Sequence, residues 1–272
     1  MQKQYKFHER KGDNTMAIIK NANANAENGL PMYTGYVDET THIHIVDGNS
    51  EMGKGIYNYS TLAGNSALVK ADGTIITDIE GTCGHHCEKC EPICYARKYS
   101  KRNHIGVIPA YIDNTLLLRS DKDKFFRELE DFFHYNMVGC FRPHVSGEFI
   151  DYDHFKRMCE FIAKHKETQF YCYTEAEEYL NRAEDEGIVP DNFIVWISCC
   201  DKLRESNPRN HRLVYLDNGK NPNPAFKGMF HCPKNTPEGK KSGITYSMCK
   251  TCPYGKAGGK GKEIRELAIW MH

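Results

Sequence analysis

The sequence lacks long apolar runs, and this absence excludes one large class of proteins. Nowhere in its 272 residues does an apolar stretch approach the roughly 18 to 20 residues that a membrane-spanning helix needs. The first residues, 1–11, are polar and charged where a signal peptide would be apolar. These absences predict a cytoplasmic protein without a membrane partner.

Net charge is also missing, because 36 Lys and Arg residues balance 36 Asp and Glu residues. That balance excludes the global basic field that most nucleic-acid-binding proteins carry. One local basic segment, 240–265, interleaves lysines with glycines and tyrosines, a pattern that suits a phosphate backbone. A solvated basic tail is the commoner explanation of such a segment. Nucleic acid therefore stays open as a partner.

Repeats and low-complexity segments are absent as well, and the chain divides by its local pattern into three regions. Residues 1–70 read as an N-terminal extension with short strands, in which the alternation at 41–46 predicts one strand. Residues 71–205 alternate strands with helices, which implies parallel βαβ units. Residues 206–272 are rich in Pro and Gly and predict a loop-rich, Cys-containing end. Strands are expected at 74–79, 138–142, 169–173 and 193–198, and amphipathic helices at 121–135 and around 155–162.

Cysteine is the abundant and informative residue type, with 12 in the chain. Clustered cysteines in a protein of this size, without a signal peptide, more often hold a metal or an iron–sulfur cluster than disulfides. Four of them, Cys83, Cys87, Cys90 and Cys94, lie within a dozen residues. Structural zinc sites usually take ligands from two separated pairs, whereas iron–sulfur sequences are closely packed. The spacing favours an iron–sulfur cluster, with zinc as the alternative, and leaves open which three cysteines hold it.

A second group of cysteines, Cys232, Cys249 and Cys252, lies in the C-terminal region. It predicts either a zinc ion that orders the loops or a second cluster. A fourth ligand could come from one of four residues, namely His231, Cys199, Cys200 or His272.

The first cysteine group also carries a resemblance. Cys83, Cys87 and Cys90 have the CxxxCxxC spacing of radical S-adenosylmethionine (SAM) enzymes, and the order of the following segments resembles their fold. That resemblance implies an α/β partial (β/α) barrel, radical SAM-like, with the loop-rich Cys-containing C-terminal tail. It further implies a 4Fe-4S cluster on these three cysteines, one iron of which stays open for a ligand.

Further positions resemble the SAM-binding positions of that superfamily. Ser146, Gly147 and Glu148 look like its GGE motif, whose carboxylate is implied to hold the amino group of SAM. Thr174 and Ser198 are similar to its polar residues at strand ends.

A closer resemblance covers most of residues 60–272, to the phage gene-product-88 family, which looks radical SAM-like itself. It is carried by the cysteine group with Tyr95 and Ala96, by 141–149 and 170–174, and by the C-terminal cysteines with His272.

Two further residues come from the strand end that carries Glu148. Arg142 suits a carboxylate of SAM or of a substrate, because its planar guanidinium forms paired hydrogen bonds. His144 suits proton transfer near the reacting centre. The alternative is structural, with an Arg142–Glu148 ion pair and a buried His144 at the strand end.

Together these features predict an iron–sulfur enzyme that uses SAM for radical chemistry and needs an electron donor. Its substrate would be a small molecule, a nucleotide or a nucleic acid. The alternative is a zinc- or cluster-stabilised nucleic-acid-binding protein without catalysis.

Overall fold

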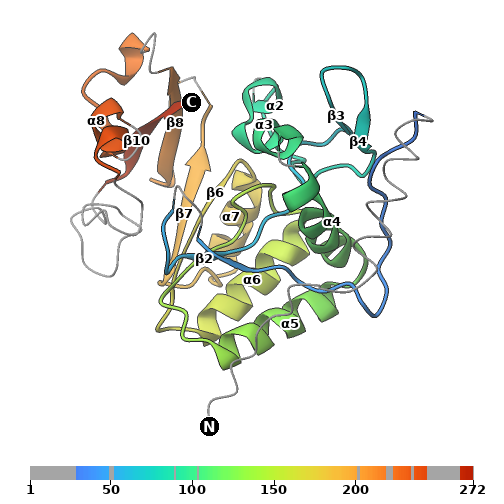
Figure 1. Cartoon of the computed structure of the whole chain (residues 1–272). Helices are drawn as coiled ribbons and strands as arrows, with labels where there is room; N and C mark the ends of the chain where they lie inside the picture. Colours follow the sequence, from blue (N-terminus) through green and yellow to red (C-terminus); the bar gives the residue numbers. More distant parts are fainter. Residues whose placement is uncertain are drawn as a thin grey trace.

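The computed structural model describes residues 29–48, 52–88, 90–102, 104–200, 203–218, 223–233, 236–243 and 264–271. Its centre is a mostly parallel, 8-stranded sheet with helices packed against it, and a 2-stranded hairpin lies apart from that sheet (Figure 1). The α/β class expected from the sequence is therefore confirmed. None of the helices in this described part combines the length and the apolar character of a membrane span.

Chain order and spatial order agree through most of the large sheet, which runs β1-β2-β5-β6-β7-β8-β10-β9. Only β1 and β2 pair antiparallel, and all the other neighbours are parallel. The carboxyl ends of β2, β5, β6, β7, β8 and β10 therefore lie at one edge of the sheet. The strands are β1 Val46–Asp47, β2 Tyr57–Asn58, β5 Cys140–Arg142, β6 Gln169–Thr174, β7 Phe193–Ser198, β8 Arg212–Asn218, β9 Phe230–His231 and β10 Glu266–Met271, and the hairpin pairs β3 Leu68–Val69 with β4 Ile75–Thr77.

The helices begin where local sequence can satisfy their first backbone N–H groups. Asp121 accepts from the Lys124 N–H at 2.9 Å before α5, and Asp151 accepts from the His154 N–H at 2.8 Å before α6. The α-helices are α2 Cys90–Ile93, α3 Tyr95–Arg102, α4 His104–Ser120, α5 Lys122–Tyr135, α6 Tyr152–Lys164, α7 Glu177–Asp185 and α8 Pro237–Lys241, with a short 3-10 helix at Pro224–Phe226.

Alternate side chains of the strands enter two cores, one on each face of the sheet. Phe170 and Cys172 of β6 pack with the apolar sides of α5, α6 and α7, whereas Tyr171 between them packs on the opposite face. Phe170 stacks on Phe133 of α5 with ring centroids 5.7 Å apart. Burial on both faces is typical of parallel sheets and explains the almost continuous apolar sequence of β7.

Most of the predicted elements are confirmed. The helices expected at 121–135 and around 155–162 are α5 and α6, and three predicted strands are β5, β6 and β7. The strand expected at 74–79 forms as β4, but it pairs only with β3 in the separate hairpin.

The strand predicted at 41–46 was largely wrong, because only its last residue enters β1. Its backbone bonds to helix side chains instead of to a neighbouring strand. The N–H of Ile43 donates to Glu128 at 2.8 Å, and that of His44 donates to Asn114 at 2.8 Å.

The sheet draws strands from all three regions of the sequence. β1 and β2 come from residues 1–70, and β8, β9 and β10 come from residues 206–272. Among the described residues, β1 and β9 form its two open edges. The structure thus shows an open parallel sheet, and its closure toward a partial barrel stays a prediction.

A buried polar cluster joins the first two parallel strands to α6. The Tyr59 hydroxyl lies 3.1 Å from Nε2 of His144 and 3.2 Å from Nε2 of His154, and all three residues are buried. Burial, together with the nearby charges of Lys122 and Arg157, lowers the pKa of His154 to about 3. His154 is therefore neutral in the folded protein at neutral pH.

The low pKa of His154 predicts a specific acid sensitivity. The unfolded chain takes up a proton on this ring as the pH falls below 6.5, whereas the folded chain does so only near 3, so stability is lost over that window. We expect His154→Gln to be less stable at pH 7 by roughly 1–3 kcal/mol. The variant should nevertheless lose less stability than wild type between pH 7 and pH 4. Urea unfolding at both pH values measures this, with the exposed His134→Gln as control, and an unchanged pH dependence in His154→Gln would contradict it.

Candidate functional site

The four clustered cysteines lie between the hairpin and α3, in the segment 83–94, which contains the short helix α2 and is called the cysteine loop here. The N–H of Cys83 donates to the carbonyl of Gly64 at 3.1 Å, and that of Cys90 donates to the carbonyl of Cys87 at 2.9 Å. Each of the four, Cys94 included, is half-buried. The thiols of Cys83, Cys90 and Cys94 lie close enough to influence one another electrostatically. Among the described residues, however, the ligand atoms that gather within 4.8 Å of one another are those of Cys87, Glu175 and Cys200, and this group does not include Cys83, Cys90 or Cys94.

The surroundings of these thiols are acidic. Burial raises the pKa of Cys83 well above its ordinary value, and the Glu148 carboxylate raises it further. Burial and then the Glu175 carboxylate raise the pKa of Cys90 to about 12. Cysteines bind a metal as thiolates. In these buried and acidic surroundings, thiolates are stable only beside a positive charge. A metal ion or an iron–sulfur cluster supplies that charge, so the donor set fits either group.

Glu148 connects the cysteine loop to two strand ends. Its Oε1 accepts from the Phe149 N–H at 2.9 Å and the Thr174 hydroxyl at 2.8 Å, and its Oε2 accepts from the Glu175 N–H at 2.8 Å. Its own N–H donates to the hydroxyl of Thr82, next to the first cysteine, at 2.8 Å. Burial raises the pKa of Glu148 to about 7, although its hydrogen bonds oppose the shift.

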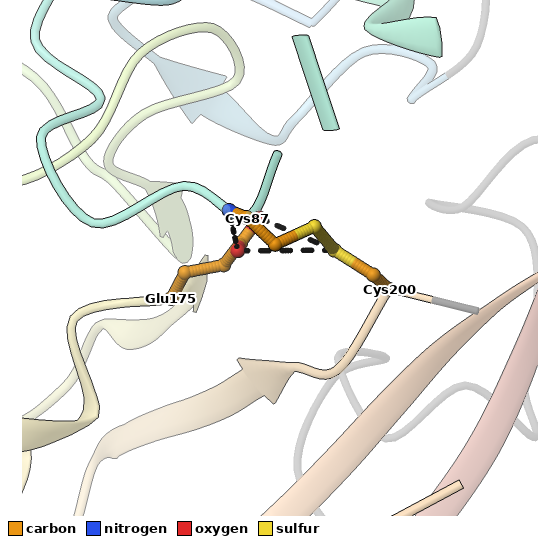
Figure 2. Close-up of side chains that lie close together, drawn as sticks. All are labelled: Cys87, Glu175 and Cys200. Atoms are coloured by element: carbon orange, nitrogen blue, oxygen red, sulfur yellow. Dashed lines mark hydrogen bonds between the residues drawn. A yellow bond between two sulfur atoms is a disulfide. The ribbon is translucent and has the colours of Figure 1, made fainter. Parts of the chain in front are cut away.

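Glu175 and Cys200 join this site, although sequence reasoning did not place them there. A carboxylate oxygen of Glu175 accepts from the Cys87 N–H at 2.7 Å, and both oxygens lie 3.8 Å from the Cys200 sulfur (Figure 2). The Cys87 and Cys200 sulfurs are joined as a disulfide. Ligand atoms of the three residues lie within 4.8 Å of one another. Their positions offered a usable signal, since Glu175 directly follows Thr174 and Cys200 follows the end of β7.

Arg142 lies beside the cysteine loop. Its guanidinium carbon is 4.9 Å from the ring centroid of Tyr173 and 5.8 Å from that of Tyr171. The Tyr95 hydroxyl interacts with Arg142 and also donates to the Val145 carbonyl. The structure thus brings the predicted Arg142 to the same side of the sheet as the cysteines.

His144 takes a structural position. Its side chain is buried between Tyr59 and Phe149, with ring centroids 4.9 and 4.6 Å away, and its backbone has a φ of 55°. These contacts place the ring in the aromatic core, and a catalytic role for His144 stays a prediction.

The other predicted SAM-binding residues occupy different kinds of position. The Ser146 hydroxyl donates to the Thr61 carbonyl at 2.9 Å, and Gly147 has a φ of 86°. Ser198 ends β7 opposite Val214 of β8. Thr174 is in direct contact with Glu148. Ser198 lies two residues before Cys200 in the chain, and the Cys200 sulfur lies near the Glu175 carboxylate.

The C-terminal cysteines are only partly described. The N–H of Cys232 donates to the Ala268 carbonyl of β10 at 3.1 Å. Cys249, Cys252 and His272 lie outside the described residues, as does most of the basic segment 240–265. A second metal site at this end stays a prediction.

These features define an α/β protein with a cysteine-rich loop at the carboxyl edge of a parallel sheet, beside two carboxylates. The chain belongs to the gene product 88 family, whose sequence profile matches residues 44–258. This confirms the resemblance to the phage family and extends it toward the N-terminus, where the match includes β1 and β2. Neither the curated proteins nor the solved structures gave a match.

The backbone at Gly147 should not tolerate a side chain. A Cβ there would lie 1.8 Å from the Thr61 hydroxyl oxygen and 2.6 Å from that of Thr82, and its φ is 86°. We expect Gly147→Ala to lower the free energy of unfolding by roughly 1–3 kcal/mol or more. Gly139→Ala, directly before β5 and with nothing within 4 Å of the added carbon, is the matched control. Urea unfolding of both variants measures the difference, and equal stabilities would contradict the expectation.

Proposed function

We propose that this protein is an iron–sulfur enzyme that binds a 4Fe-4S cluster on Cys83, Cys87 and Cys90 and uses SAM for radical chemistry. The observation that carries the proposal is the meeting of the cysteine loop with Glu148 and Glu175. Both carboxylates stand just beyond the carboxyl ends of strands, which is where parallel α/β folds collect functional groups.

The order of the strands supports the same proposal. From β2 to β10, the parallel neighbours follow one another along the chain, interrupted only by the β3–β4 hairpin and by the edge strand β9. The cysteine loop lies between the first and the second of these parallel strands, and the Glu148 segment follows the second. This arrangement agrees with a radical SAM-like partial barrel.

Glu148 suits the amino group of SAM. An ionised carboxylate offers about four lone-pair positions, and the chain's own donors use three of them. One position is left for an ammonium group, and the hydrogen bond from Thr174 fixes the carboxylate's orientation. Arg142, beside Tyr95, suits the carboxylate of SAM or of a substrate.

When bound, such a cluster supplies the electron that divides SAM into methionine and a 5′-deoxyadenosyl radical able to take hydrogen from a substrate. The chain's own residues bind the cluster and SAM and orient them relative to each other. The cysteine thiolates hold the cluster, Glu148 and Arg142 hold the charged ends of SAM, and the half-buried loop limits the access of water. The electron comes from a separate donor.

A nucleotide or nucleic-acid substrate is the class we favour. The guanidinium of Arg142 lies 4.9 Å from the ring centroid of the half-buried Tyr173. Guanidinium groups beside aromatic rings suit ligands that combine phosphates with bases.

Loss of one cluster cysteine tests the proposal. We expect Cys87→Ala, reconstituted with iron and sulfide without oxygen, to lose most of the bound iron of wild type. After dithionite and SAM are added, it should also lose formation of 5′-deoxyadenosine, measured by mass spectrometry. Cys159→Ala, at a buried position on α6, is the control and should keep both the bound iron and the formation of 5′-deoxyadenosine. Full iron content in Cys87→Ala would contradict the cluster assignment, and wild type that takes up zinc instead of iron would favour a binding protein without catalysis.

The role of Glu148 is tested separately. Glu148→Gln should keep the cluster, because no proposed ligand is removed, and should weaken SAM binding by about tenfold or more, because a charge-assisted hydrogen bond is lost. Equilibrium binding of SAM to the reconstituted protein measures this. The exposed Glu160→Gln of α6 is the control, and an unchanged affinity in Glu148→Gln would remove the proposed contact.

A further inference from the structure

We propose that Cys200 is a further ligand of the metal centre on the cysteine loop, a centre that it shares with Cys87 beside the Glu175 carboxylate. The inference rests on the proposed metal centre and deepens it. It adds a ligand from the segment after β7, which lies 113 residues beyond Cys87 in the chain.

Three side chains from separate parts of the fold converge at this site. Cys87 comes from the cysteine loop, Glu175 from the end of β6 and Cys200 from the end of β7, and Figure 2 shows them directed toward one another. The thiol of Cys90 also hydrogen-bonds to Glu175. Glu175 is thus in contact with two cysteines of the loop and with Cys200.

The separation of the two backbones supports a shared metal. The Cα atoms of Cys87 and Cys200 are 7.3 Å apart, whereas most disulfides span about 4.4–6.8 Å. A metal ion between two thiolates, with metal–sulfur bonds of about 2.3 Å, suits the longer separation. Metal binding also needs no oxidant, because each thiol gives up one proton as its sulfur binds the divalent ion.

The backbone of Cys200 is held in an uncommon conformation. Its φ is 50°, a left-handed value that residues other than glycine rarely adopt and that concentrates at functional sites. The Cys200 carbonyl accepts from the Leu216 N–H at 2.6 Å, which ties this conformation to β8. The neighbouring Cys199 differs, because its sulfur lies 3.6 Å from the Ile197 carbonyl of its own strand.

The donor set defines the class of metal. Two thiolates with a nearby carboxylate suit a thiophilic divalent ion, which would be iron of the proposed cluster or zinc in its absence. In a cluster held by three loop cysteines, Cys200 would bind the iron that is otherwise open. SAM would then have to displace the Cys200 thiolate to bind there.

The test uses the full chain, reduced and kept without oxygen, with Co²⁺ alone as the probe. The intensity of the thiolate-to-cobalt absorption band reports how many sulfurs bind the ion. We expect Cys200→Ser to lower Co²⁺ affinity at least about tenfold and to reduce the band intensity per bound ion. Cys159→Ala, at a buried position on α6 that belongs to no proposed metal site, is the control and should behave as wild type. Unchanged affinity and intensity in Cys200→Ser, or no Co²⁺ binding by wild type, would overturn the inference.

A second variant covers the case in which Cys200→Ser does not fold. Glu175→Gln keeps an oxygen to accept the Cys87 N–H but removes the charge, so it should also weaken Co²⁺ binding, and unchanged affinity there would overturn the inference. The 5′-deoxyadenosine assay on wild type runs in parallel. If SAM is not cleaved but Cys200→Ser loses Co²⁺, only the proposed function fails. If SAM is cleaved and Cys200→Ser keeps Co²⁺, only the inference fails.

Discussion

The buried carboxylate of Glu148 is the contact on which the arrangement of the site depends. It accepts hydrogen bonds from its own segment and from the end of β6, while its backbone is bonded to Thr82 at the start of the cysteine loop. Removing a buried acceptor leaves its donors without partners, at about 1–3 kcal/mol for each group. The loop and the two strand ends are therefore held as one unit, and the positions of the thiols follow from the packing of the sheet.

The parallel sheet makes this meeting possible. Because β5, β6 and β7 run side by side in the same direction, the residues that follow them emerge at one edge. Apolar side chains on both faces fix the sheet against the helices and against the opposite core. A rigid sheet edge can hold polar groups that would repel one another in a flexible loop, which is why Glu148 and Glu175 can stand close to the thiols of Cys83 and Cys90.

Local signals in the sequence predicted the elements better than they predicted the site. The capping Asp121 and the helical spacing of phenylalanines were sufficient for α5, since both act within a few residues. The alternation at 41–46 misled because a strand also needs a neighbour, and this segment bonds to helix side chains instead. β8 and β10 were missed because prolines and glycines dominate their surroundings. Motif spacing pointed to the loop cysteines and a family resemblance pointed to Glu148, but the contact of Cys87 with Cys200 joins residues 113 positions apart and needs the folded sheet.

The sulfur of Cys87 can belong either to a disulfide or to a metal site, but not to both at once. The Cys87 sulfur bonded to Cys200 in a disulfide has no thiolate to give a metal, and a metal-bound Cys87 cannot form the disulfide. Burial, and then the nearby carboxylates, raise the pKa of Cys83 and of Cys90 and so disfavour their thiolates. A bound metal ion neutralises the negative charge of its thiolate ligands, and its binding free energy adds to the stability of the folded protein. Under the proposed function, a metal bound by the reduced protein would stabilise the region where Glu148 and Glu175 meet the loop, and the contacts of Glu175 place Cys200 beside this region.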